Sequence, residues 1–226
     1  GLTLSTVIII AALGTGDTET DTLTVASLDG TTHDIVVSVA GADEPVELVN
    51  GSFEDGLTGF QTAGSAAAVT ISTLGGLTVN PTDGAQFLAL STDTDFGGTI
   101  ATDAEIETLL GISAGALDGL GNGDAIEGSV AQTTFYLAAG STLTFDYLFD
   151  TQDAAPSNDF AFLKLSPSSI EEIADVELVG DGGDTGWLTY SFTATDAGNY
   201  DLGIGVVDSG SSFGTSLFYI DWMAIV

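Results

Sequence analysis

The sequence predicts an all-β protein whose larger part is a two-sheet sandwich of jelly-roll type. Two observations predict this fold class. The 226 residues include 30 glycines, and aspartate outnumbers glutamate among the acids, a composition typical of turns rather than of helices. Short apolar stretches also recur between turn signals, and in several of them apolar and polar side chains alternate with a period of two, as in half-buried strands.

The chain divides near residue 45. Residues 1–45 hold three apolar, β-prone stretches at 2–13, 22–28 and 33–40. Three strands are about half of a sandwich and are marginal alone, so we expect more chain or another molecule to complete this block. Residues 46–226 form the second block, in which strands are predicted at 67–72, 86–91, 128–137, 142–150, 160–166, 186–194, 200–207 and 217–226.

One helical insert interrupts the second block. Thr102 and Glu105 have the spacing of a capping box, and Ile106, Leu109 and Leu110 follow at helical intervals. We therefore predict a short helix and a long loop within 102–121. Long loops are often functional, but a cover over the sheet is the simpler interpretation.

The charge balance excludes several classes of function. The chain carries 33 acidic residues and a single basic one, Lys164, for a net charge of −32. Such a chain has no basic patch for nucleic acid or for an anionic membrane. It has no cysteine and one histidine, which excludes disulfides, thiolate catalysis and a multi-histidine zinc site. Its longest apolar run, residues 7–13, is too short to span a bilayer.

The excess of negative charge needs compensation. Self-repulsion destabilises a compact state, and either high salt or bound divalent cations relieve it. Calcium is favoured because the acids cluster in turns rich in Gly, Asn and Ser. For most individual acids, a solvated surface suited to salty water is an equal alternative.

Part of the first block resembles a known bacterial module. The run 29–41, followed by Asp43-Glu44-Pro45, resembles the last strands of a cadherin-like or VCBS-type repeat in the RTX class of surface adhesins. The resemblance covers about 45 residues and departs from the family at the Asn position of the linker. In such adhesins calcium rigidifies rods at the linkers, so the resemblance implies Asp43 and Glu44 as calcium ligands and neighbouring repeats of the same protein as partners. It also implies a partial Ig/cadherin-like β block over 1–45.

The second block resembles the carbohydrate-binding-module-like jelly rolls of exported bacterial proteins. The resemblance rests on segments 50–54, 84–90, 145–149, 158–162 and 218–221 taken in order. Similar modules hold a structural calcium ion between the first segment and an aspartate of the last strand. The resemblance therefore implies Glu54 and Asp221 as calcium ligands, and it implies no catalytic residue.

The residues themselves add reasons for these metal predictions. Asp221 lies within an apolar run, where an unpaired carboxylate is costly; a strand bend facing water is the alternative. One loop is flanked by three acids, Asp150, Asp153 and Asp159. Their carboxylates would repel one another unless they are held apart or bridged by a cation. Ordinary Asx turns are the rival interpretation of that loop. A third group, around 181–184, reads more simply as a bare turn.

Aromatic and catalytic candidates are few. Trp187 lies on the Thr/Ser side of its strand, so we predict partial exposure and a candidate stacking platform for a sugar; packing under a loop is the alternative. Trp222 is expected in the core. His33 is the only histidine, and no two acids are placed by the sequence across a cleft. We therefore expect no enzyme activity.

The first stretch is a predicted assembly element. A terminal apolar strand must be covered, or it promotes aggregation. Residues 2–12 are predicted to act as a donor strand inserted into a neighbouring subunit; a rod repeat cut in half is the alternative. The predicted interface residues are Leu2, Leu4, Val7, Ile8, Ile9 and Ile10.

Together these features predict an extracellular or cell-surface protein, stabilised by calcium, that mediates attachment or assembly in a matrix or biofilm. Two alternatives stay open. One is a filament subunit joined by its N-terminal strand, and the other is a carbohydrate-binding module with a glycan as its partner.

Overall fold

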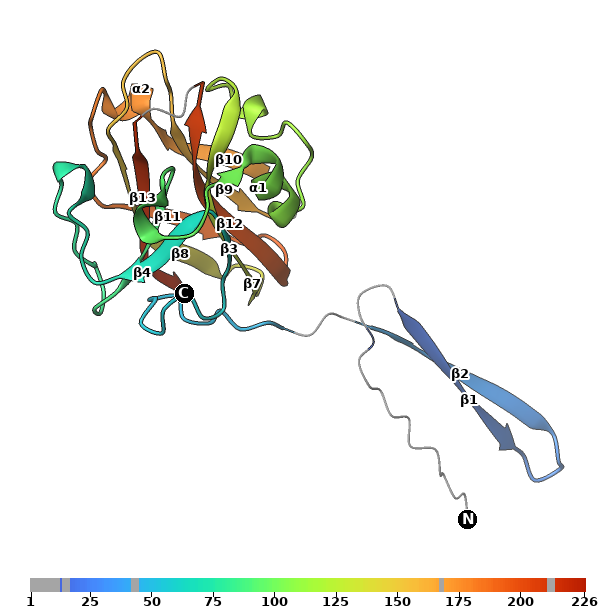
Figure 1. The fold of residues 1–226 in the computed structure, drawn as a ribbon. Helices are drawn as coiled ribbons and strands as arrows, with labels where there is room; N and C mark the ends of the chain where they lie inside the picture. The colour runs from blue at the N-terminus through green and yellow to red at the C-terminus, as the bar shows by residue number, and fades with distance from the viewer. Residues whose placement is uncertain (1–12, 14–16, 42–44, 167–168, 211–213) are drawn as a thin grey trace. The chain divides into compact units, whose positions relative to one another are not determined.

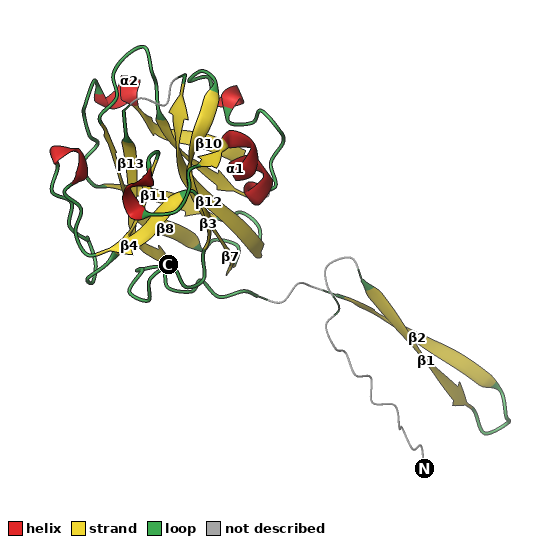
Figure 2. Cartoon of the chain, viewed as in Figure 1, coloured by secondary structure: helices red, strands yellow, loops and turns green. Residues whose placement is uncertain are grey.

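A computed structural model describes residues 13, 17–41, 45–166, 169–210 and 214–226 (Figure 1). The chain separates into two compact units, Gly1–Pro45 and Val46–Val226. Strands dominate both units (Figure 2). The predicted all-β class is confirmed. No helix among the described residues is long and apolar enough to cross a membrane.

The first unit is an antiparallel hairpin of β1 (Thr18–Ala26) and β2 (Thr32–Ala40), with Leu23 opposite Ile35. In its turn, the Asp29 carboxylate accepts hydrogen bonds from the Ser27 hydroxyl and the Thr31 amide. These bonds lower the pKa of Asp29 to about 2. Residues 2–12, which include the predicted donor strand, lie outside the described residues, as do Asp43 and Glu44.

The second unit is a sandwich of two antiparallel sheets. The six-stranded sheet has the order β10-β9-β12-β7-β3, with β6 also pairing β7, and the five-stranded sheet has the order β11-β8-β13-β5-β4. The strands are β3 (Gln61–Ala63), β4 (Ser65–Val69), β5 (Phe87–Ser91), β6 (Ala101–Thr102), β7 (Ala125–Leu137), β8 (Thr142–Thr151), β9 (Phe160–Leu165), β10 (Ser169–Asp175), β11 (Leu188–Thr193), β12 (Gly198–Ser209) and β13 (Ser216–Ile225).

The main core lies between the two sheets. The alternation in β8 places Leu143, Phe145 and Phe149 in this core, as the sequence predicts, and β12 contributes Leu202 and Ile204. All five side chains are fully buried. At about 1.5–3 kcal/mol for each large apolar side chain, this layer holds the sheets together.

Helix α1 (Asp103–Leu110) covers the outer face of the six-stranded sheet. Its capping box forms as predicted, since the Thr102 hydroxyl accepts from the Glu105 amide at 3.3 Å and the Glu105 carboxylate accepts from the Thr102 amide at 2.9 Å. Ile106 and Leu110 pack with Phe160 in a second apolar cluster. The insert is therefore a cover over the sheet. A second, one-turn helix, α2 (Val176–Val179), follows β10.

An apolar segment covers one part of the outer face of the five-stranded sheet. Ser72 and Val79 form an isolated antiparallel bridge, and the segment between them packs on Phe87, Leu148 and Tyr219. The rest of this face, along β11, β8 and the end of β13, carries polar side chains and is the region from which the candidate site is built.

Candidate functional site

A polar row crosses three neighbouring strands of the five-stranded sheet. Thr189 of β11 is the cross-strand partner of Asp146 of β8, and Asp146 is the partner of Asp221 of β13. The Thr189 hydroxyl donates to the Asp146 carboxylate at 2.6 Å. Two residues further along each strand, Ser191 pairs with Thr144. Since Phe145 between Thr144 and Asp146 is buried in the core, the alternating polar side chains belong to the outer face.

An exposed tryptophan stands beside this row. The pairing of β13 with β8 shifts register between Asp221 and Ala224, and Trp222 within the shift has φ = 49°. Trp222 is 55% exposed, whereas Met223 is buried in the core. The prediction that Trp222 lies in the core is therefore wrong, because the bulge inserts an extra residue and breaks the alternation on which it rested.

The backbone that carries Trp222 is held by its neighbour. The Trp222 amide donates to Asp221 Oδ1 at 2.8 Å. On the other side of the bulge, the Met223 amide donates to the carbonyl of Gly51 at 2.9 Å. A Cβ at Gly51 would lie 2.2 Å from the Met223 carbonyl oxygen, so glycine is needed for this close approach. The indole is thus exposed on a fixed backbone.

Trp187 has a different environment. Its indole N–H donates to the Asn80 carbonyl at 3.1 Å, and its ring packs edge-to-face with Phe87, with centroids 6.0 Å apart. Trp187 is half-buried. The structure therefore places it against the 72–79 cover and the adjoining Asn80, which leaves only part of the ring for a ligand.

Asp221 is completely buried, with donors on both oxygens. Oδ2 accepts from the Thr82 amide at 2.7 Å, the Asp83 amide at 3.0 Å and the Thr82 hydroxyl at 3.2 Å, and Oδ1 accepts from the Trp222 amide. Burial raises the pKa of Asp221, and these hydrogen bonds act in the opposite direction. The carboxylate anchors the 82–83 turn over the sheet.

Glu54, the predicted partner of Asp221, binds the same turn further along. Its Oε1 accepts from the Ala85 amide at 2.7 Å and the Gln86 amide at 2.8 Å. A Cβ on Gly84 would lie 2.3 Å from that oxygen. Glu54 and Asp221 therefore both hold the segment 82–86 by its amides. Nowhere in the described ranges do three Asp, Glu, His or Cys side chains form a cluster suited to a metal ion.

The three acids predicted to share one calcium loop have different neighbours in the structure. Asp150 faces Asp184 across an isolated bridge, and burial, followed by the charge of Asp184, raises the pKa of Asp150 to about 6. Asp153 and Asp159 instead lie near each other, close enough for the charge of Asp153 to raise the pKa of Asp159. Asp159 is also a neighbour of Asp208.

Sequence reasoning missed Asp208. It is almost completely buried near the end of β12, next to Asp159 across the pairing of β12 with β9. Burial and the charge of Asp159 raise its pKa to about 9. The local signal was an acid directly after the apolar pair Val206-Val207, at the end of a strand whose inward face is otherwise apolar.

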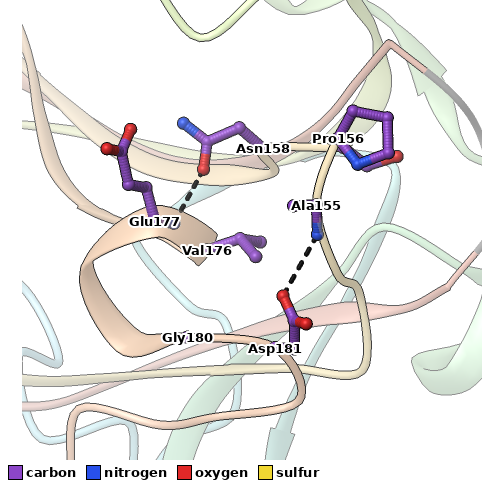
Figure 3. A pocket seen from close by; sticks show the side chains of 8 residues that line it. Ala155, Pro156, Asn158, Val176, Glu177, Gly180 and Asp181 are labelled. Carbon is purple, nitrogen blue, oxygen red and sulfur yellow. Dashed lines mark hydrogen bonds between the residues drawn. The ribbon is translucent and has the colours of Figure 1, made fainter.

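A solvent-open cleft of about 360 Å³ lies beside α2 (Figure 3). Its walls are the segments 155–158 and 176–181, joined by two hydrogen bonds. Asn158 Oδ1 accepts from the Glu177 amide at 2.9 Å, and Asp181 Oδ1 accepts from the Ala155 amide at 3.1 Å. The Asn158 amide group is thereby fixed, so the cleft is a built feature of this end of the sandwich.

No protein family and no curated protein matches the sequence. Among solved structures, the chain is similar to a family 61 carbohydrate-binding module in complex with β-1,4-galactotriose, at 10% identity and a TM-score of 0.43, over 81% of this chain and 99% of that one. It is also similar to a family 16 carbohydrate-binding module, at 13% identity and a TM-score of 0.38, over 79% and 97% of the two chains. A third is the K3 adhesin domain of Lys-gingipain from Porphyromonas gingivalis, at 14% identity and a TM-score of 0.37, over 80% and 98%.

Proposed function

We propose that the sandwich of residues 46–226 is a non-catalytic glycan-binding module and that Trp222 is its stacking platform. The observation that carries this proposal is the exposed indole of Trp222, held on a β-bulge directly after Asp221 of the polar row. A large aromatic ring offers apolar contact area at low entropic cost. The exposed hydroxyl group of Thr189 in this row can exchange hydrogen bonds with sugar hydroxyls.

The charge of the chain narrows the ligand class. With a net charge of −32, the surface repels sulfated, phosphorylated or uronic-acid polymers. Asp146 adds a carboxylate within the polar row itself. We therefore propose neutral polysaccharides as ligands, met outside the cell, and an attachment role at a surface or in a matrix.

The test compares three single variants on an array of neutral and anionic glycans. We expect Trp222→Ala to weaken binding at least tenfold without lowering the unfolding temperature, because more than half of the ring is exposed. Trp222→Tyr should retain part of the affinity, since it keeps an aromatic face. Trp187→Ala should mainly lower stability, through lost contact with Phe87. Wild-type binding by Trp222→Ala, or no binding of the wild type to any neutral glycan, would refute the proposal.

We also keep calcium at Glu54 and Asp221 as a proposal. Amides of the 82–86 segment already satisfy Asp221 Oδ2 and Glu54 Oε1, and the Trp222 amide satisfies Asp221 Oδ1, so these three oxygens offer no orphaned atom in support of an ion there. Calcium titration of Glu54→Gln against the wild type tests the site. Loss of one bound equivalent supports it, and an unchanged number contradicts it.

A second candidate function is assembly through the hairpin. Leu23, Ile35 and Val37 are exposed on one face of β1–β2, and no further strand pairs with this two-stranded sheet within the described residues. Such a sheet is marginal until its apolar face is covered. Another copy, contributing the predicted donor segment 2–12, would cover it. Electron microscopy of the chain in millimolar calcium should show filaments that vanish when residues 1–12 are deleted; discrete wild-type monomers would contradict it.

A further inference from the structure

Two aspartates meet at one end of the sandwich, between the sheets. Asp159 directly precedes β9 and is 0% exposed, and Asp208 near the end of β12 is 1% exposed. They are neighbours across the sheet, because Val207 pairs with Phe160, and each carboxyl affects the pKa of the other. Asp159 Oδ1 accepts from the Ser209 amide at 3.0 Å, and Oδ2 accepts from the Ser216 hydroxyl at 2.7 Å. The Ser216 contact joins the five-stranded sheet to the pair.

Two carboxylate oxygens around this pair lack a hydrogen bond. Asp208 Oδ1 and Asp153 Oδ2 are buried and have no partner among the described residues. Asp153 is only 8% exposed, and its charge acts on Asp159. Leaving such atoms unsatisfied costs about 1–3 kcal/mol each, and more when the group is charged. These orphaned atoms distinguish the pair from an ordinary acidic surface.

The chain has no positive side chain to offer this region. Lys164 is its only strong base, and it pairs with Asp201 at 3.9 Å. The cross-strand partner of Asp208 is another acid, Glu127, which adds repulsion. Two adjacent buried carboxylates must therefore take a positive charge from solution, either a shared proton or a cation.

We propose that Asp159 and Asp208 bind a divalent cation, Ca²⁺, together with the hydroxyl groups of Thr92 and Ser216 beside them. The polar groups around them are oxygen donors, as Ca²⁺ requires. The Ser216 hydroxyl donates to Asp159 at 2.7 Å, and the Thr92 hydroxyl lies close enough to Asp208 to lower its pKa. Thr92 and Ser216 are bonded to each other as well, through the Ser216 amide at 2.9 Å.

The proposed ion would tie the two sheets together at this end. Asp159 and Asp208 adjoin neighbouring strands of the six-stranded sheet, whereas Thr92 and Ser216 adjoin β5 and β13 of the five-stranded sheet. The ion would thus replace a repulsion inside the core by a contact between the sheets. This site is independent of the proposed glycan-binding face and of the Glu54–Asp221 pair.

The test is calcium binding by the full chain after treatment with a chelator. Isothermal titration with CaCl₂ should show that Asp208→Asn binds one equivalent of calcium fewer than the wild type. In thermal melts, calcium should also raise the unfolding temperature of the variant by less than that of the wild type. The asparagine keeps the shape and can still donate to Asp159, so the variant is expected to fold. Glu54→Gln is the matched control, because it should retain the Asp159–Asp208 equivalent.

Two outcomes would overturn the proposal: equal calcium binding by the wild type and Asp208→Asn, or no binding by the wild type at millimolar calcium. Either result would mean that the pair shares a proton. If Asp208→Asn does not fold, the anomalous signal of wild-type crystals grown with a lanthanide replaces the comparison. A peak between Asp159 and Asp208 supports the site, and its absence rejects it.

Discussion

Asp221 and Asp159 are both fully buried in the same sandwich, yet their surroundings differ. Asp221 receives three amide N–H groups and one hydroxyl, all from Thr82, Asp83 and Trp222. Asp159 receives one amide and one hydroxyl and then faces a second carboxyl group, that of Asp208. A buried carboxylate is tolerated when preorganised donors replace its hydration. Where the neighbour is another acid, the stability of the buried carboxylate depends on whether the solution supplies a proton or a cation.

The largest expected effect is a loss of stability with rising pH in the presence of a chelator. Burial raises the pKa of Asp159 to about 6 and, with the Asp159 charge, that of Asp208 to about 9. Because both values exceed the unfolded value of 3.8, this contribution is complete below pH 3.8 and is lost as the pH rises through 6 and 9.

Denaturant unfolding between pH 4 and pH 9 measures this loss. General self-repulsion of the acidic chain also grows with pH, so the informative quantity is the difference between the wild type and Asp208→Asn. The variant should lose much less stability over the range. Calcium in excess should flatten the wild-type curve if the pair binds the ion. Parallel curves for the two proteins in chelator would show that the pair does not contribute.

The second effect concerns the well-satisfied acid. Asp221→Ala removes the acceptor for the Thr82, Asp83 and Trp222 amides and leaves a small cavity beneath the turn. We expect the free energy of unfolding to fall by about 2–3 kcal/mol, the range for hydrogen bonds to a charged group. Asp221→Asn should lie between this variant and the wild type, because an amide oxygen can still accept. Equal stability of Asp221→Ala and the wild type would contradict the role of Asp221 as an anchor.

The sequence predicts features that depend on neighbouring residues better than features that depend on residues far apart in the chain. Alternation within 142–150 predicted the buried side of β8, and the Thr102–Glu105 spacing predicted α1, because both signals are local. The bulge at Trp222 has no comparable local signal, since an ordinary strand pattern continues through it. Asp208 meets Asp159 across about fifty intervening residues, and only the sheet topology brings them together. The alternation within β9 and within β12 shows which side chains point inward, but it does not show which acids of the two strands face each other.

A smaller effect is expected at Ser216 of β13, whose hydroxyl connects the five-stranded sheet to Asp159 of the acid pair. Ser216→Ala removes the hydroxyl that donates to Asp159 and contacts the Thr151 hydroxyl at 2.8 Å. The expected loss is about 1–2 kcal/mol in chelator. It should shrink when the pH is lowered to 4, because a protonated carboxyl depends less on the donor. A loss that does not change between pH 4 and pH 8 would separate Ser216 from the charge of the pair.

The smallest effect is expected at Thr82, whose hydroxyl makes the longest hydrogen bond to Asp221. The Thr82 hydroxyl lies 3.2 Å from Asp221 Oδ2, whereas the Thr82 and Asp83 amides lie at 2.7 and 3.0 Å. Thr82→Val removes only the longest of these bonds and leaves both amides in place, so we expect a loss of about 0.5 kcal/mol, at the low end for a single hydrogen bond. Thr82→Ser keeps the hydroxyl and should match the wild type in the same denaturant titration. A loss above about 2 kcal/mol for the valine variant would mean that the hydroxyl, rather than the backbone amides, stabilises the buried charge.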